Sequence, residues 1–250
     1  MKRIFSSIIT LGLVAAATVT SCKKDDTICY NNVTMGNIVG ETIVSDQGNT
    51  FDIVETPYEI NLSDYTYGRI ILSCDVLTQT AENRYDIRLH GIESVLTKPA
   101  VKKSTITDEE LEVEDAIIIR DIWFGGGYIN MLIEFAHKNG SETKHFINLI
   151  HDDTSTEEGY SFILRHNAYG EVPTEGETYR SSNGYVSFPI SQLIEGDQAE
   201  ISIKWKSHKM TGFGYDLYET EEMTQKGTWK RSTFEHNTPT LKSSRSFNVR

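Results

Sequence analysis

Apolar and polar residues alternate along most of the chain beyond residue 32, and this period of two is what most restricts the fold. In an extended strand successive side chains point to opposite faces, whereas an amphipathic helix repeats every 3.6 residues. Ile201, Ile203 and Trp205, for example, are separated by Ser202 and Lys204. The pattern predicts an all-β protein whose sheets bury one face and expose the other.

The spacing of the expected strands predicts two domains. The first set is expected over 33–44, 50–54, 68–78 and 84–96. These strands predict a small OB-like barrel over residues 33–98, which Pro99 ends because proline breaks a strand ladder. The second set, separated by glycine-bearing turns, is expected over 116–119, 127–135, 144–150, 160–166, 184–190 and 200–206. This set predicts an antiparallel β-sandwich over residues 99–210.

A short helix and a polar tail complete the expected fold. Thr107 with Glu110 three residues later forms a capping box, which is typical of a helix start. The apolar run that follows limits this helix to about two turns, because such runs are typical of strands. Residues 211–250 are rich in Thr, Ser, Lys and Glu, and we expect them to form a polar C-terminal tail. Only residues 213–218 alternate in a strand-like way within it.

The first residues of the chain predict an export signal. Lys2 and Arg3 precede a mostly apolar stretch that ends at Val19. The stretch is shorter and more polar than the roughly 20 apolar residues that span a bilayer, so it is typical of a signal peptide. We expect this signal peptide to occupy residues 1–21.

Cys22 is the expected point of attachment to a membrane. The segment Val19-Thr20-Ser21-Cys22 is similar to a lipobox, the bacterial pattern whose cysteine is acylated. Two or more acyl chains such as palmitate anchor a protein stably, since each buried CH₂ contributes about 0.8 kcal/mol. Residues 22–32 would then form a tether. The alternative is an ordinary secretory peptide with a chance cysteine at the cleavage point.

The four charged residues after the cysteine bear on which side of a membrane the protein faces. Lys23-Lys24-Asp25-Asp26 is similar in form to the short signal that sends lipoproteins of Bacteroidota-type bacteria to the outer face of the outer membrane. This predicts a lipid-anchored protein at the cell surface. The alternative is a solvated charge cluster in a tether that faces the periplasm.

The negative charge of the chain argues against nucleic acid as a partner. The sequence has 24 basic and 36 acidic residues, a net charge of −12, and removal of the signal peptide takes away two bases and no acid. Binding to phosphates requires clustered Lys and Arg that release counterions. We therefore expect no nucleic-acid partner.

Two cysteines remain after acylation of Cys22. In an oxidising envelope Cys29 and Cys74 could form a disulfide that ties the tether to the barrel. Cys74 also occupies an inward position of its expected strand, where a free thiol behaves as a small apolar side chain. Both interpretations stay open, and neither requires a reactive thiolate.

The residues that could bind a metal or a phosphate fall in two loops. His151-Asp152-Asp153, with Glu157 and Glu158, offers oxygen and imidazole ligands, but Ser and Thr beside them are typical of a solvated loop. We expect no metal and no cofactor.

Gly125-Gly126-Gly127 precedes a strand rather than a helix, which favours close backbone approach over phosphate binding. The aromatic residues around it, Trp123, Phe124 and Tyr128, are a candidate surface for a sugar or a protein.

The order of segments resembles that of the NigD-like lipoproteins. The resemblance rests on Met35-Gly36-Asn37, Arg69-Ile70-Ile71-Leu72, the stretch 92–98 and the stretch 121–130, which contains Trp-Phe-Gly-Gly-Gly-Tyr-Ile-Asn. It covers about residues 30–206 and the lipobox. It implies an OB-like barrel followed by a β-sandwich. It implies no settled activity, because the family is named for its association with a bacteriocin gene cluster.

These observations favour a non-catalytic envelope lipoprotein that recognises or assembles with another component. Its expected partners are the membrane, through the lipid anchor, and an envelope protein or glycan. The chain has no HExxH, GxSxG or CxxC motif. The alternative is an envelope hydrolase whose site is built from scattered carboxylates such as Glu134, Asp152 and Glu171.

Overall fold

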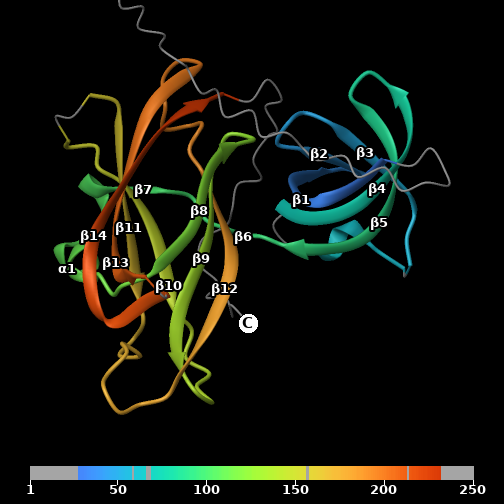
Figure 1. The fold of residues 1–250 in the computed structure, drawn as a ribbon. Helices are drawn as coiled ribbons and strands as arrows, with labels where there is room; N and C mark the ends of the chain where they lie inside the picture. Colours follow the sequence, from blue (N-terminus) through green and yellow to red (C-terminus); the bar gives the residue numbers. More distant parts are fainter. Residues whose placement is uncertain (1–27, 58, 66–68, 156–157, 213, 232–250) are drawn as a thin grey trace, which may run out of the picture.

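The structure is a computed structural model that describes residues 28–57, 59–65, 69–155, 158–212 and 214–231. In this part of the chain strands predominate and form a closed barrel and two packed sheets (Figure 1). No helix within it is both long and apolar enough to cross a membrane. The predicted signal peptide, Cys22 and residues 23–26 lie outside the described residues.

The N-terminal domain is a closed barrel of five strands. They are β1 (Ile28–Val39), β2 (Thr42–Ser45), β3 (Thr50–Glu55), β4 (Arg69–Ala81) and β5 (Arg84–Ser94), in the order β1-β2-β3-β5-β4. All neighbours are antiparallel except β3 and β5, which are parallel. Alternate side chains fill the interior, among them Ile43, Phe51, Leu72, Ile87 and Leu89. The predicted small barrel is confirmed.

Two strands of the barrel end at other residues than expected, because the chain turns elsewhere. The strand expected over 33–44 is two strands, because the chain turns at Gly40, whose φ of +62° suits glycine. The strand expected to end at residue 78 continues to Ala81, and Asn83 makes the tight turn to β5 with a φ of +55°. A short 3₁₀ helix (Leu62–Asp64) precedes β4.

The C-terminal domain is a sandwich of two sheets. One has the order β14-β13-β11-β10-β7, the other β6-β12-β9-β8. The strands are β6 (Leu96–Thr97), β7 (Val101–Lys102), β8 (Ile118–Gly125), β9 (Tyr128–Lys138), β10 (Phe146–His151), β11 (Tyr160–Asn167), β12 (Tyr179–Pro189), β13 (Gln198–Thr211) and β14 (Gly214–Lys230). Both sheets contribute to one apolar core, which includes Ile129, Met131, Phe162, Phe188, Ile203 and Trp205. The predicted sandwich is confirmed, although three pairs, β6 with β12, β7 with β10 and β11 with β13, are parallel.

The short helix is present where the capping box predicts it. A 3₁₀ helix (Lys103–Thr105) leads into α1 (Asp108–Glu112). The N–H of Leu111 donates to the carbonyl of Thr107 at 3.2 Å. The apolar run that follows continues into β8, so the helix stays brief.

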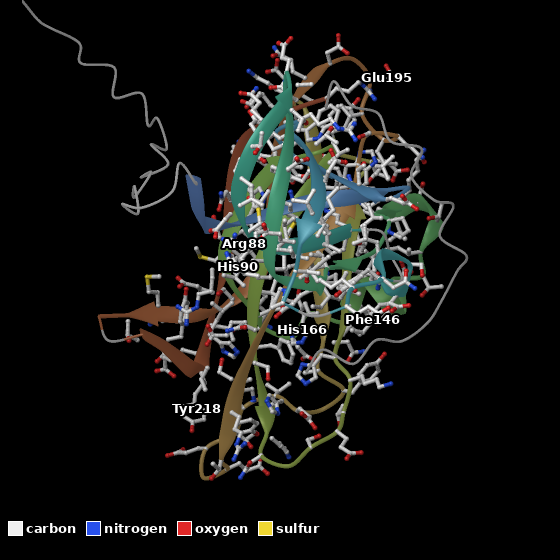
Figure 2. The ribbon with its side chains drawn as sticks, turned by 90° about the vertical axis from the view of Figure 1, so that its right-hand side faces the viewer. Arg88, His90, Phe146, His166, Glu195 and Tyr218 are labelled. Carbon is white, nitrogen blue, oxygen red and sulfur yellow. The ribbon has the colours of Figure 1, made fainter. Side chains whose placement is uncertain are left out.

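The expected polar tail is wrong for residues 214–230, because they form β14, the longest strand in the described part of the chain. β14 pairs with β13 from Thr211↔Gly214 to Gln198↔Lys230. Near its end Trp229 is fully buried in the sandwich core. The end of the β13–β14 hairpin projects from the body of the sandwich beside the exposed Tyr218 (Figure 2). Residues 232–250 of the predicted tail lie outside the described residues.

The barrel packs on the outer face of the β6-β12-β9-β8 sheet (Figure 1). Ile129 and Phe188 point into the sandwich core, so the adjacent Asn130 and Ser187 point to the other face. There they meet the barrel through Arg69 of β4. Beside them an apolar cluster joins the domains: Met35, Ile71 and Val95 pack with Trp123 and Tyr185.

Candidate binding site

Arg69 is buried where the barrel meets the sandwich, and its guanidinium makes five hydrogen bonds. Within the barrel it donates to the two carboxylate oxygens of Asp46 at 2.9 and 2.8 Å and to Asn37 Oδ1 at 3.3 Å. Within the sandwich it donates to Ser187 Oγ at 2.9 Å and to Asn130 Oδ1 at 2.7 Å. An arginine has five N–H donors, so this set uses its full capacity. The arrangement orients the two domains, because a buried charge tolerates little loss of its partners.

The glycine run leaves room for the ion pair between Arg69 and Asp46. Gly126 and Gly127 make the two-residue turn between β8 and β9, with φ values of +61° and +87°. Asp46 lies directly against the turn, and a Cβ at Gly126 would lie only 2.3 Å from Asp46 Oδ1. The predicted close backbone approach is therefore present, and it serves the contact between the domains.

A cleft of about 240 Å³ opens beside this contact, and we call it the interdomain cleft. It is lined by Met35, Asp46, Gln47, Ile71, Asp121, Trp123, Leu132 and Tyr185. The Trp123 and Tyr185 rings meet edge to face, with centroids 6.3 Å apart and an interplanar angle of 78°. Gln47 and Asp121 are exposed at the cleft, whereas Met35 and Ile71 are buried in its floor.

The three aromatic residues predicted as one surface are divided between different places. Trp123 is half-buried and lines the interdomain cleft. Phe124 points to the opposite face of the sheet, where it packs against the sandwich core and occupies the space beside Gly227. Tyr128 is buried, with its ring 3.9 Å from the Arg69 guanidinium carbon. The alternation of β8 separates Trp123 from Phe124, so only Trp123 is placed to meet a ligand at the cleft.

The acids proposed for a hydrolase lie apart, each with its own partners. Glu134 binds Arg120 and Ser181 on the outer face of the β6-β12-β9-β8 sheet, and the Arg120 hydrogen bond lowers its pKa. Asp152 lies in the loop after β10. Burial opposes its ionisation, but hydrogen bonds from Thr154 and Lys103 hold its pKa below the usual value. A general acid needs a raised pKa, so neither carboxyl group has the required property.

Glu171 belongs to a buried cluster with two histidines that the sequence pattern did not reveal. His145 Nδ1 lies 2.9 Å from His166 Nε2, and His145 Nε2 lies 3.4 Å from a Glu171 oxygen. His166 Nδ1 donates to the Ala116 carbonyl at 3.1 Å, so its Nε2 accepts from His145. Burial lowers the pKa of both rings, that of His166 to about 4. The cluster does not line the interdomain cleft.

The loop considered for a metal is occupied by protein contacts. Asp153 accepts hydrogen bonds from the N–H and hydroxyl of Ser104, and Asp152 forms an ion pair with Lys103. His151 packs against Tyr160 and Phe162. Glu157 lies outside the described residues. Within the described part of the chain no cluster of three or more ligand side chains could hold a metal ion.

The Cys74 side chain is buried in the barrel interior. Burial raises the pKa of the Cys74 thiol to about 12, so in its reduced form this cysteine is protonated and a poor nucleophile. The register of β1 and β4 pairs Cys29 with Asp75, and the Cys29 side chain lies outside the described residues. The disulfide between Cys29 and Cys74 therefore stays a prediction.

Comparison with known proteins identifies the sandwich. Residues 98–218 match the family model of the NigD-like C-terminal beta sandwich domain. The predicted resemblance to the NigD-like family is thereby confirmed. No curated protein matches the chain.

Several solved structures are similar to this chain over most of its length. A NigD-like immunity protein from Bacteroides caccae ATCC 43185 is 17% identical, with a TM-score of 0.54, and the match covers 81% of this chain and 94% of that one. A protein of unknown function from Bacteroides vulgatus ATCC 8482 is 16% identical, with a TM-score of 0.58 and coverage of 87% and 97%. A candidate lipoprotein from Bacteroides fragilis NCTC 9343 is 14% identical, with a TM-score of 0.55 and coverage of 82% and 99%. At these identities the likeness shows a shared fold.

Proposed function

We propose that this chain, whose residues 98–218 match the NigD-like C-terminal beta sandwich domain, is a non-catalytic lipoprotein of the bacterial envelope that recognises another envelope component. The lipobox at Cys22 supports the anchor, and residues 23–26 support display at the cell surface. The neighbour from B. fragilis, a candidate lipoprotein, supports an envelope location.

The observation that best supports a recognition function is the interdomain cleft, whose side chains are held in place before any ligand binds. The hydrogen bonds from Arg69 to Ser187 and Asn130 fix the two domains against each other. Trp123 and Tyr185 are held by the apolar cluster that joins the domains. A site whose side chains are already immobile loses little entropy when it binds. Such a cleft between two domains is a common place for a binding site.

The recognition role also agrees with the dispersal of the acids. Glu134, Asp152 and Glu171 share no partner with one another, and hydrogen bonds lower the pKa of each despite their partial burial. A hydrolase built on them would need two of these groups to face a common substrate. We therefore place the hydrolase alternative second.

Photo-crosslinking in intact cells tests this function. A photoreactive residue at Gln47, on the rim of the cleft, is compared with one at Glu41, which is also exposed but lies in the β1–β2 turn outside the cleft. We expect adducts with an envelope protein or glycan from position 47 and not from position 41. Equal adducts at both positions, or none at position 47, would contradict a recognition role for the cleft.

A further inference from the structure

The charges around the interdomain cleft restrict what it can bind. Among the residues that the structure describes, no Lys, Arg or His lines it. Arg69 lies close by, but it is 1% exposed and its donors are occupied by protein groups. An anionic ligand would meet carboxylates without a free cation, so phosphates and acidic sugars are unfavourable.

The polar groups that remain free in the cleft are those that bind hydroxyl groups. Asp46 is committed to Arg69 through both of its oxygens. The side chains of Asp121 and Gln47, both exposed, have no hydrogen-bond partner among the described residues. A carboxylate accepts from two hydroxyl groups at once, and an amide both donates and accepts. The pair therefore offers directional bonds to a neutral polyol.

The apolar walls of the cleft suit the C–H groups on the face of a sugar ring. Trp123 and Tyr185 stand nearly perpendicular and both line the cleft, so two aromatic rings of different orientation border it. Met35, Ile71 and Leu132 extend this surface with aliphatic groups. The C–H groups on one face of a pyranose ring pack against such surfaces, while its hydroxyl groups point outward to polar partners.

The size of the cleft sets the length of ligand that it holds. Its volume of about 240 Å³ is below the roughly 300–1,000 Å³ of pockets that enclose drug-sized ligands. One sugar ring therefore fits, and the exposed rim at Gln47 and Asp121 leaves room for the rest of a chain to continue into solvent.

We propose that the interdomain cleft binds one neutral sugar ring of a glycan chain, with Trp123 and Tyr185 as the apolar platform and Asp121 and Gln47 as the hydroxyl partners. This inference rests on the proposed recognition function and gives its ligand a chemical class. The competing occupant is a cationic side chain of a protein, which would use the Trp123 ring and the Asp121 charge.

Tryptophan fluorescence provides a direct readout of this cleft. The chain has three tryptophans, and the other two, Trp205 and Trp229, are only 5% and 0% exposed. Trp123 alone is half-buried, so quenching by acrylamide reports mainly on its accessibility. The experiment uses the mature lipoprotein in a detergent without a sugar head group. The probes are the trisaccharides chitotriose, cellotriose, xylotriose, mannotriose and maltotriose, and a lysine-rich peptide.

We expect at least one trisaccharide to protect Trp123 from acrylamide in a saturable way, with the same affinity at low and high NaCl. Asp121→Asn should weaken that binding about tenfold, because it removes a charged hydrogen-bond acceptor. The matched control is Glu82→Gln at the exposed β4–β5 turn, which should bind as the wild type does. Thermal melting of each variant checks that it is folded.

Three results would overturn the sugar assignment. No trisaccharide protects Trp123 in the folded protein, or only the lysine-rich peptide protects it and does so in a salt-sensitive way. The third is equal weakening by Asp121→Asn and Glu82→Gln, which would place binding outside the cleft. Crosslinks from position 47 that persist in any of these cases would preserve the recognition function and reject only the sugar class.

Discussion

Asp46 and Arg69 form a bidentate ion pair at the contact between barrel and sandwich, with only 5% and 1% of their side chains exposed. Asp52 and Arg84 also form a bidentate pair, through Nε and Nη2 of the arginine, on the barrel surface, with 25% and 48% exposed. The first pair is buried and its arginine has three further partners, whereas the second pair is largely exposed. They provide a controlled comparison of how burial changes the cost of losing one partner.

Asp46→Ala should lower the free energy of unfolding by about 3–5 kcal/mol, because it leaves the Arg69 charge buried without its carboxylate. Asp52→Ala should cost about 1 kcal/mol or less, since its arginine is solvated. Urea denaturation of the two variants measures both values. Similar losses would show that Arg69 finds other partners or water once Asp46 is removed.

Gly126→Ala tests the close approach of the β8–β9 turn to Asp46. Gly126 and Gly140 both have a positive φ, +61° and +80°, so alanine is strained at either position by about 1–2 kcal/mol. A Cβ at Gly126 would also lie 2.3 Å from Asp46 Oδ1, whereas nothing lies within 4 Å of one at Gly140. Gly126→Ala should therefore lower the melting temperature more than Gly140→Ala. Equal effects would mean that backbone strain alone matters.

The period of two located most of the strands because burial of one face is a local property of the sequence. It indicated only residues 213–218, at the start of β14, and missed the rest of this strand, whose exposed positions are mostly polar and which is held by pairing with β13. Gly227 of β14 faces the core, but Phe124 of β8 fills the space that its side chain would take. An apolar pattern in one strand cannot show that another strand supplies the missing side chain.

The contact between the domains could be predicted only in part. The glycine run indicated a close backbone approach, yet the approaching group, Asp46, is about 80 residues away in sequence. The partners of Arg69 lie 23 to 118 residues away from it. The expected aromatic surface failed as a unit because consecutive residues of a strand, Trp123 and Phe124, face opposite sides of its sheet.

His166 should make the stability depend on acid pH. Burial, with a smaller contribution from His145, lowers its pKa in the folded protein to about 4, whereas an unfolded chain titrates near 6.5. Between these values the unfolded state binds the extra proton, so the free energy of unfolding falls as the pH decreases from about 6.5 to 4, by about 3 kcal/mol from this group.

His166→Gln should reduce this dependence of the free energy of unfolding on pH. His90→Gln, at an exposed histidine paired with Asp75 on the barrel (Figure 2), should keep it. The same decrease of unfolding free energy with falling pH in the wild type and both variants would exclude His166 as the cause of the acid sensitivity.

Metabolic labelling with palmitate tests the membrane anchor. The wild-type protein should incorporate the label, and Cys22→Ala should not, because only Cys22 follows the lipobox. Cys29→Ala is the control and should be labelled normally. Label in Cys22→Ala at the wild-type level would refute the lipoprotein assignment.

Added protease tests the side of the membrane on which the protein lies. If residues 23–26 direct surface display, protease should remove the mature chain from intact cells. A periplasmic marker should survive the same treatment. Protection of the chain in intact cells, with cleavage only after lysis, would place it inside the outer membrane.

Trp229 and Arg231 should carry much of the contribution of the C-terminal strand to stability. Trp229 is fully buried in the sandwich core, and the guanidinium of Arg231 donates to the carbonyls of Gly196 and Ile194 at 3.1 and 2.9 Å. Trp229→Ala should lower the free energy of unfolding by about 3–5 kcal/mol through loss of packing. Met223→Ala is the matched control, because this β14 side chain is 37% exposed and should change stability by less than about 1 kcal/mol.

Two truncations extend this comparison to the whole segment. Removal of everything from Thr211 deletes β14, which leaves the edge of β13 unpaired and takes Trp229 out of the core, so the sandwich should lose cooperative unfolding. Removal from Arg231 onward keeps β14 but deletes the Arg231 contacts with the loop before β13, so it should cause a measurable but smaller decrease in melting temperature. Calorimetry of both truncations gives the two values. An unchanged melting temperature after removal from Thr211 would mean that β14 contributes nothing to the sandwich despite the burial of Trp229.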